Sequence, residues 1–213
     1  PIIADEIYGR CVFQGQFSPM HLYSGDVPVI SVGGLAKEFI VPGWRVGWII
    51  LHDKGTGRLA DYKSGLKQLT QIIVGANSLI QAAIPRLLCP TPGSKDEQSL
   101  QQFSRRYMDI LSQNAKLCVE LSQSCPELTV IEPTGAMYVM IKVDIAALEG
   151  IIDDADFARK LLEEENLFIL PGQCFNMANF VRLVICPPEE TIREAFERFS
   201  LFCDRHRKKV SQA

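Results

Sequence analysis

Short apolar runs and helical apolar spacing follow one another in the first half of the chain. Three short runs rich in β-branched side chains predict buried strands. They lie at residues 2–4, 27–32 and 46–51. Residues 59–73 and 77–88 carry apolar side chains at helical spacing, and Pro85 is expected to kink or break the second of these helices. Strands followed by helices indicate an α/β domain.

A long helix is predicted next, from about Lys95 to Ser124, and a second pattern of short strands and helices follows Pro126. The predicted strands lie at 128–131, 136–143, 168–170 and 180–185. A helix over 155–164 is expected to be capped by Asp153 or Asp154. The last helix, after Pro187, has an amphipathic core face made of Ile192, Ala195, Phe196, Phe199 and Cys203. We expect one domain over 1–110 and a small α+β domain over 111–213.

Composition and charge exclude several classes of partner. The net charge of −3 gives no electrostatic reason to expect nucleic acid or a membrane surface. The one basic cluster, Arg205–Lys209, is expected to be a solvated helix end that complements the helix dipole. No apolar run is long enough to span a membrane.

The cysteines and histidines favour a reducing compartment. Seven cysteines are odd in number and form no CxxC pair, and the three histidines are scattered. Neither a disulfide framework nor a metal site is expected. The chain starts inside a strand, at Pro1-Ile-Ile-Ala4, so it is expected to be the later part of a longer protein. We expect a cytoplasmic location and leave a mitochondrial one open, since a leader would precede this strand.

The stretch from Ser31 to Trp48 carries the main candidate chemistry. Two glycines precede Lys37, and a Pro-Gly turn delivers Arg45 eight residues after that lysine. A lysine on a loop between buried strands suits covalent carbonyl chemistry, and an arginine fork suits a phosphate. A loop in which Lys37 pairs with Glu38 is the open alternative.

Two other kinds of site, a dinucleotide-binding site and a serine hydrolase site, are excluded because residues that they require are absent. Gly55-Thr-Gly57-Arg-Leu-Ala60 matches the dinucleotide fingerprint, but no acidic residue occurs over 62–95 to bind a ribose. For serine hydrolases there is no G-x-S-x-G motif, and Gly34 stands where S-x-x-K needs a serine. Both interpretations are rejected.

Three further polar residues stand at strand ends or within strands. Asp5 and Tyr8 follow the first strand, where open α/β sheets bind ligands, or they simply cap the start of a loop. Arg182 lies on a strand of otherwise apolar residues. Its charge needs a partner there, so it is expected either to bind a substrate carboxylate or to face outward.

Five motifs occur in an order and spacing that carry a resemblance. They are Ala4-Asp-Glu-Ile-Tyr8, Gly34-Leu-Ala-Lys37 with Arg45 and Gly47, Pro133-Thr-Gly-Ala-Met137, Leu170-Pro-Gly172, and Phe180-Val-Arg-Leu183. On these motifs the chain resembles the aminotransferases of pyridoxal-phosphate (PLP) fold type I. The resemblance implies the α/β fold of aspartate-aminotransferase-like enzymes, with part of the large PLP-binding domain followed by the small α+β domain.

The resemblance also implies a role for each candidate residue. Lys37 would bind PLP covalently and later move a proton as general base and acid. Asp5 would pair with the pyridinium nitrogen and Tyr8 would bind the phenolic oxygen. Arg45 would hold the phosphate, and Arg182 the substrate α-carboxylate. The implied reaction moves the amino group of tyrosine, or a related amino acid, to 2-oxoglutarate, giving 4-hydroxyphenylpyruvate and glutamate in a homodimer.

Departures from the family pattern limit these expectations. Gly34 replaces a serine that contacts the phosphate in many members. Residues 71–77 lack the arginine that aspartate-type members carry, which favours non-acidic amino donors. A PLP-dependent lyase (C–S lyase or ACC-synthase type) on the same fold and a non-catalytic domain remain alternatives. The 213 residues alone are expected to be inactive. In family members the other cofactor contacts come from an N-terminal part that precedes the region resembled here.

Overall fold

The computed structural model describes residues 1–72 and 74–208, which form two compact units. The first unit ends at Arg106 and the second begins at Tyr107. The division falls inside helix α4 (Lys95–Ser122), four residues before the boundary expected after residue 110. Each unit is described by itself below.

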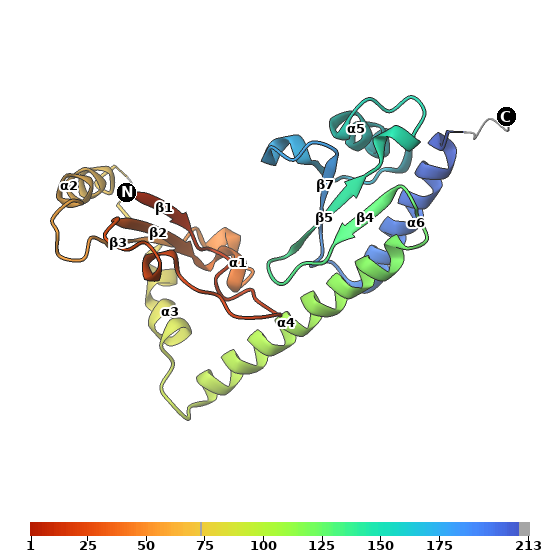
Figure 1. Ribbon diagram of the computed structural model, residues 1–213. Helices are drawn as coiled ribbons and strands as arrows, with labels where there is room; N and C mark the ends of the chain where they lie inside the picture. Colours follow the sequence, from red (N-terminus) through yellow and green to blue (C-terminus); the bar gives the residue numbers. More distant parts are fainter. Residues whose placement is uncertain (73, 209–213) are drawn as a thin grey trace. The chain divides into compact units, whose positions relative to one another are not determined.

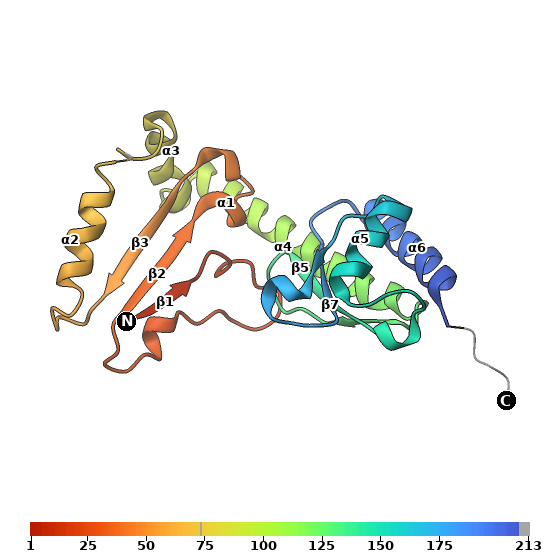
Figure 2. The ribbon, with the colours of Figure 1, turned by 90° about the horizontal axis from the view of Figure 1, so that it is seen from above.

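The first unit contains a three-stranded sheet in the order β1-β2-β3. The strands are β1 (Ile2–Asp5), β2 (Val29–Gly34) and β3 (Gly47–His52). β1 and β2 are parallel, whereas β3 is antiparallel to β2 (Figure 2). All three predicted strands are confirmed, the second and third beginning one or two residues later than expected.

Two glycines let β2 and β3 pair closely at one end of this sheet. A Cβ atom on Gly33 would lie 2.7 Å from the indole nitrogen of Trp48. One on Gly34 would lie 2.9 Å from the backbone oxygen of Val46. Side chains do not fit at such distances unless the neighbour moves. The sheet therefore requires a very small residue at position 34.

Two helices follow the sheet in the first unit. They are α2 (Ala60–Leu69) and α3 (Ser78–Leu88). The expected end of the first helix, residue 73, lies outside the described residues. α3 continues through Pro85, so of the two expected effects of this proline the break is wrong, and the kink stays a prediction. Proline removes one N–H and leaves the later bonds possible, as in the bond from Cys89 N–H to the Pro85 carbonyl.

The second unit is a four-stranded antiparallel sheet with helices. Its strand order is β4-β5-β7-β6. Figure 1 labels the first three of these strands. The strands are β4 (Leu128–Ile131), β5 (Tyr138–Val143), β6 (Leu170–Pro171) and β7 (Phe180–Val184), and the helices after α4 are α5 (Asp154–Glu165) and α6 (Glu189–His206). The short helices of the chain are η1 (Met20–Leu22), α1 (Leu35–Glu38), η2 (Pro42–Trp44), η3 (Ile145–Ala147) and η4 (Gly172–Phe175).

Alternation along β5 and β7 separates the core face of this sheet from its other face. Val139, Ile141 and Val143 are almost fully buried, as are Val181 and Leu183. The alternate residues of the two strands, among them Tyr138 and Arg182, lie on the opposite face. The core continues in the aromatic side chains of α5 and α6, where the rings of Phe157 and Phe202 meet edge to face at 5.2 Å.

The basic C-terminal cluster is a solvated helix end in its described part, as predicted: Arg205 and His206 lie in the last turn of α6, and Arg205, Arg207 and Lys208 are exposed. Arg205 pairs with Glu164 and Glu165 of α5, and His206 lies 3.0 Å from a Glu164 oxygen. Arg207 donates from Nε to Oε1 of Glu127 at 2.5 Å. The cations thus join the end of α6 to acidic residues elsewhere in the unit. Lys209 lies outside the described residues.

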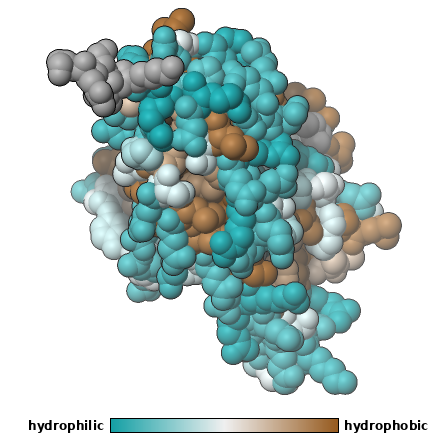
Figure 3. Space-filling view, turned by 90° about the vertical axis from the view of Figure 1, so that its right-hand side faces the viewer, coloured by the Kyte–Doolittle hydropathy of each residue, from teal (hydrophilic) through white to brown (hydrophobic). Residues whose placement is uncertain are grey.

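Within the described residues no helix is both long and apolar enough to cross a membrane. On the face shown in Figure 3, hydrophobic residues form small areas among hydrophilic ones. The exposed apolar side chains of α5 and α6, Leu162 and Leu201, are 43% and 56% accessible. Single exposed apolar side chains of this kind are ordinary on protein surfaces.

The Glu127–Arg207 pair makes the stability of the second unit depend on pH. The Arg207 guanidinium holds the pKa of the Glu127 carboxyl below its usual 4.5, although burial acts in the opposite direction. A depressed carboxyl pKa stabilises the fold above the unfolded value, and this contribution is lost as the pH falls through the folded value. Glu127→Gln is therefore expected to lower Tm by about 5 °C at pH 7. Circular dichroism should show this difference shrinking below pH 4.5.

Glu189→Gln is the matched control for this prediction. Glu189 also pairs with an arginine, Arg193, at 2.6 Å, but its side chain is 58% exposed. Exposed pairs within one helix contribute little, so Tm should change by about 1 °C or less. A Glu127→Gln variant as stable as the wild type at pH 7 would contradict the stabilising role of this pair.

Candidate active site

The sheet of the first unit brings three of the candidate residues to one edge. Asp5 ends β1 in register with Val32 of β2, and β2 then runs on to Gly34. Lys37 follows three residues later. β3 is antiparallel, so Gly47 starts it opposite Gly34, and Arg45 lies just before that start. Asp5, Lys37 and Arg45 therefore follow or precede strands at the same edge, where sheets of this kind bind ligands.

Lys37 lies in the segment between strands β2 and β3, as predicted, and within that segment it belongs to a single helical turn, α1. Leu35 is fully buried and anchors this turn. Its N–H donates to the Val46 carbonyl at 3.2 Å, and its own carbonyl accepts from Phe39 at 3.1 Å. The lysine itself is half-buried. Glu38, considered from the sequence as a partner for Lys37, accepts a hydrogen bond from Arg10 at 2.9 Å.

Arg45 lies in a left-handed conformation, with φ 54° and ψ 42°, at the end of η2. Its guanidinium donates to the Pro42 carbonyl at 3.0 Å. The side chain is exposed and lines a groove of about 680 Å³ together with Trp44 and the start of α3 at Asn77. A guanidinium and a helix N-terminus both favour anions. The groove is thus suited electrostatically to a phosphate.

Asp5 and Tyr8 occupy the turn that leaves β1. An Asp5 oxygen accepts from the Ile7 N–H at 3.2 Å, the contact expected if Asp5 only caps the loop. The carboxylate is nevertheless exposed, as a ligand contact requires. Tyr8 is half-buried, and its carbonyl closes a tight turn by accepting from Cys11 at 2.8 Å. Capping and ligand binding are therefore compatible at Asp5.

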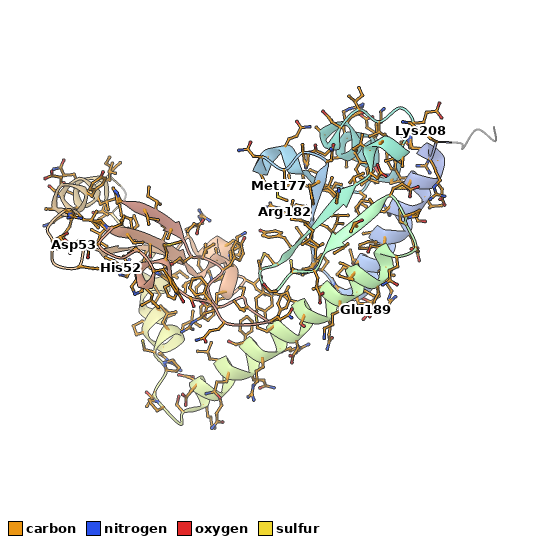
Figure 4. All side chains as sticks on the ribbon, in the orientation of Figure 1. His52, Asp53, Met177, Arg182, Glu189 and Lys208 are labelled. Atoms are coloured by element: carbon orange, nitrogen blue, oxygen red, sulfur yellow. The ribbon has the colours of Figure 1, made fainter. Side chains whose placement is uncertain are left out.

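Arg182 projects from β7 and is held between two aromatic rings. Its Cζ atom lies 4.2 Å from the centroid of the Tyr138 ring and 4.4 Å from that of Phe175. The side chain is half-buried, and its Nε atom is buried without a hydrogen-bond partner among the described residues. Figure 4 labels Arg182 together with Met177 of the loop that precedes β7. A planar cation stacked in this way offers its edge to an anion.

The sequence did not indicate the two rings that hold Arg182. Tyr138 directly follows the Pro133–Met137 motif, and Phe175 lies three residues after Leu170–Gly172, so both are close to recognised motifs. Tyr138 lies beside Arg182 because β5 and β7 pair with Met140 opposite that arginine. This pairing register depends on tertiary packing and could not be read from either strand alone.

A second buried cluster also escaped the sequence analysis. The side-chain ligand atoms of Cys125, Glu127 and Cys203 lie within 4.8 Å of one another, and all three residues are buried. The Glu127 carboxylate already accepts from Arg207 and from the Cys125 thiol at 3.4 Å. A hydrogen bond with Cys125 and burial raise the pKa of Cys203. The cluster therefore favours a protonated Cys203 thiol and a structural ion pair between Glu127 and Arg207.

Comparison with known proteins gives a family match and close relatives. The sequence profile of the family described as aminotransferase class I and II matches residues 1–199. Tyrosine aminotransferase of Dictyostelium discoideum is 40% identical over 214 residues, covering 98% of this chain and 49% of its own length. The human tyrosine aminotransferase is 38% identical over 207 residues, covering 97% of this chain and 44% of its own.

A solved structure of an aminotransferase has the same fold as this chain. The crystal structure of tyrosine aminotransferase from Leishmania infantum superposes with a TM-score of 0.83 at 33% identity, over 98% of this chain and 49% of that one. The fold is thus that of the aspartate and tyrosine aminotransferases, PLP fold type I, as expected from the sequence. The chain spans about half the length of the curated relatives it matches.

Proposed function

The chain belongs to the aminotransferase class I and II family, and from this premise we propose that the full-length protein is a PLP-dependent aminotransferase acting on tyrosine. The amino group would pass to 2-oxoglutarate, giving 4-hydroxyphenylpyruvate and glutamate. The observation that supports this most is the convergence of Asp5, Lys37 and Arg45 at one edge of the β1-β2-β3 sheet. Their chemistry matches the distinct groups of PLP.

The side chains of the first unit suit the cofactor group by group. The Lys37 amine would hold its aldehyde carbon, and the exposed Asp5 carboxylate would keep its ring nitrogen protonated. The Tyr8 hydroxyl would bind the phenolic oxygen. Arg45 would hold the phosphate in the groove that it lines with the start of α3. When bound, the cofactor supplies an electron sink for the substrate α-carbon.

Each residue then has a task in the reaction. Arg182, fixed between Tyr138 and Phe175, would bind the substrate carboxylate and so orient the α-carbon. The amine of Lys37 would take the α-proton as general base and return it as general acid. Asp5 and Arg45 would keep the ring and the phosphate in place during this transfer.

Gly34 fits this account although it removes one phosphate contact. A side chain there would lie 2.9 Å from the Val46 oxygen, so the close pairing of β2 with β3 excludes the serine found in many family members. Arg45 would then carry more of the phosphate binding. A homodimer and a cytoplasmic location, both expected from the sequence, stay predictions.

A product assay on the full-length protein tests the proposed reaction. Tyrosine with 2-oxoglutarate should give an oxo acid and glutamate, and no oxo acid should form without the acceptor. Because residues 71–77 contain no arginine for a second carboxylate, kcat/KM for tyrosine should exceed that for aspartate by about tenfold or more.

Two results of this assay would contradict the proposal. Ammonia or a cleaved side chain formed without an acceptor would indicate a PLP-dependent lyase. A preference for aspartate over tyrosine would show that the specificity assignment is wrong while leaving transamination itself intact.

A further inference from the structure

Asp154 is a fully buried carboxylate with a role different from helix capping. It is the first residue of α5, but the N-cap of that helix is Asp153, whose side chain accepts from the Asp156 N–H at 2.8 Å. Asp154 is 0% exposed. Its two carboxylate oxygens accept hydrogen bonds from Gln173 and Asn179 instead, so it reaches out of its own helix.

These bonds hold both ends of one loop, residues 172–179. The N–H of Gln173 donates to Asp154 at 2.8 Å and its side-chain amide at 3.2 Å. The N–H of Asn179 donates at 3.0 Å. The loop between them is tightly folded, because a Cβ atom on Gly172 would lie 2.1 Å from the Met177 oxygen. Asp154 is thus the buried anchor of the loop.

The loop carries Phe175, one of the two rings stacked on Arg182. The centroid of its ring lies 4.4 Å from the guanidinium carbon. Phe175 belongs to the short helix η4, whereas the other ring, that of Tyr138, belongs to strand β5. Tyr138 is held by the sheet, whereas Phe175 depends on the loop for its position. The orientation of the Arg182 plane therefore depends on contacts that Asp154 maintains.

We propose that Asp154 is a positioning residue for carboxylate binding, because it anchors the 172–179 loop that presses Phe175 onto Arg182. It touches no substrate and acts only through Phe175 and Arg182. The proposal rests on the proposed function, since it assumes that Arg182 binds the substrate carboxylate.

The charge of Asp154 supports this role. Burial raises its pKa, but the hydrogen bonds from Gln173 and Asn179 outweigh burial and leave the pKa below the usual 3.8. The carboxylate is therefore ionised at neutral pH, and its oxygens accept the three hydrogen bonds from Gln173 and Asn179. Asp154→Asn has nearly the same shape but directs an NH2 group at an N–H donor, so at least one bond is lost.

The test compares Asp154→Asn with Asp156→Asn in the full-length holoprotein. Asp156 lies on the same helix and is also bonded, to the Ile152 N–H at 3.2 Å and to Arg159 and Lys160. Within the described part of the chain, its hydrogen bonds and ion pairs go to residues other than those of the 172–179 loop. Two readouts are used: the NMR signal of the Arg182 Nε–H group, which senses the rings above and below it, and the affinity for 3-phenylpropanoate, a carboxylate without an amino group.

Asp154→Asn should shift or broaden the Arg182 signal and weaken 3-phenylpropanoate binding about tenfold, while Asp156→Asn behaves as the wild type. KM for tyrosine should rise more than kcat falls. Should Asp154→Asn fail to fold, Gln173→Ala, which removes the 3.2 Å bond, should change both readouts in the same direction by a smaller amount.

The outcomes separate this proposal from the proposed function. An unchanged Arg182 signal and unchanged affinity in Asp154→Asn, or in Gln173→Ala if that variant must stand in, would overturn the role of Asp154. If the wild type binds 3-phenylpropanoate no more tightly than an Arg182→Lys variant does, the assignment of Arg182 fails and with it this proposal. In that case the Arg182 signal still shows whether Asp154 controls the loop.

Discussion

Lys37→Ala is expected to lower kcat for amino transfer from tyrosine by about a thousandfold in the full-length protein. The α-proton would then lack a positioned base, and the cofactor would lack its covalent attachment. The fold should survive, because the turn around Lys37 is anchored by buried Leu35 and by backbone bonds to Val46 and Phe39. Steady-state kinetics and circular dichroism on the same samples measure both effects.

Two further variants separate the chemistry of Lys37 from its charge. Lys37→Arg keeps the positive charge but cannot release a proton near neutral pH, so it should be as inactive as Lys37→Ala. Lys63→Ala removes an exposed lysine of α2 and should leave the kinetics unchanged. Activity in Lys37→Arg above about a tenth of the wild type would show that Lys37 contributes only charge.

Arg182→Lys should lower kcat/KM for tyrosine by about tenfold to a hundredfold, mainly through KM. Lysine keeps the charge but loses the planar fork that Tyr138 and Phe175 hold between their rings. The loss should be confined to donors that carry a carboxylate. Kinetics with tyrosine and with tyramine, which lacks one, measure the ratio of the two kcat/KM values.

The matched control for this prediction is Arg193→Lys on α6. Arg193 is 51% exposed and pairs with Glu189 within the helix, so its replacement should leave the ratio unchanged. An Arg182→Lys variant that lost activity equally toward tyrosine and tyramine would contradict carboxylate binding and indicate a structural role for the arginine.

The strands and long helices were largely predictable because their patterns are local. Period-two alternation and β-branched runs placed β1, β4 and β7, and the amphipathic face of α6 contains the expected Ile192 and Phe199. Motif spacing placed Asp5, Lys37 and Arg45 near strand ends. They lie at one edge of the sheet because β1 and β2 are parallel and β3 is antiparallel to β2.

Features that depend on contacts distant in sequence were not predictable. The turn α1 is anchored by the buried Leu35, whose N–H donates to the carbonyl of Val46 just before β3, and no local pattern indicated this bond. The sequence did not indicate the ion pairs of Arg205 and Arg207, because their acidic partners are 40 and 80 residues away. Asp154 was a candidate helix cap because it stands at the start of α5. Its hydrogen bonds to the loop could not be predicted, because its partners lie 19 and 25 residues further on.

The central claim, that Lys37 is the residue that binds the cofactor, is tested most directly by borohydride reduction. The full-length protein is incubated with PLP, reduced with borohydride, digested with protease and examined by mass spectrometry. The account predicts a pyridoxyl group on the peptide that contains Lys37 and none on that peptide in Lys37→Ala. A pyridoxyl group absent from Lys37, or found in equal amount on exposed lysines such as Lys63, would contradict it.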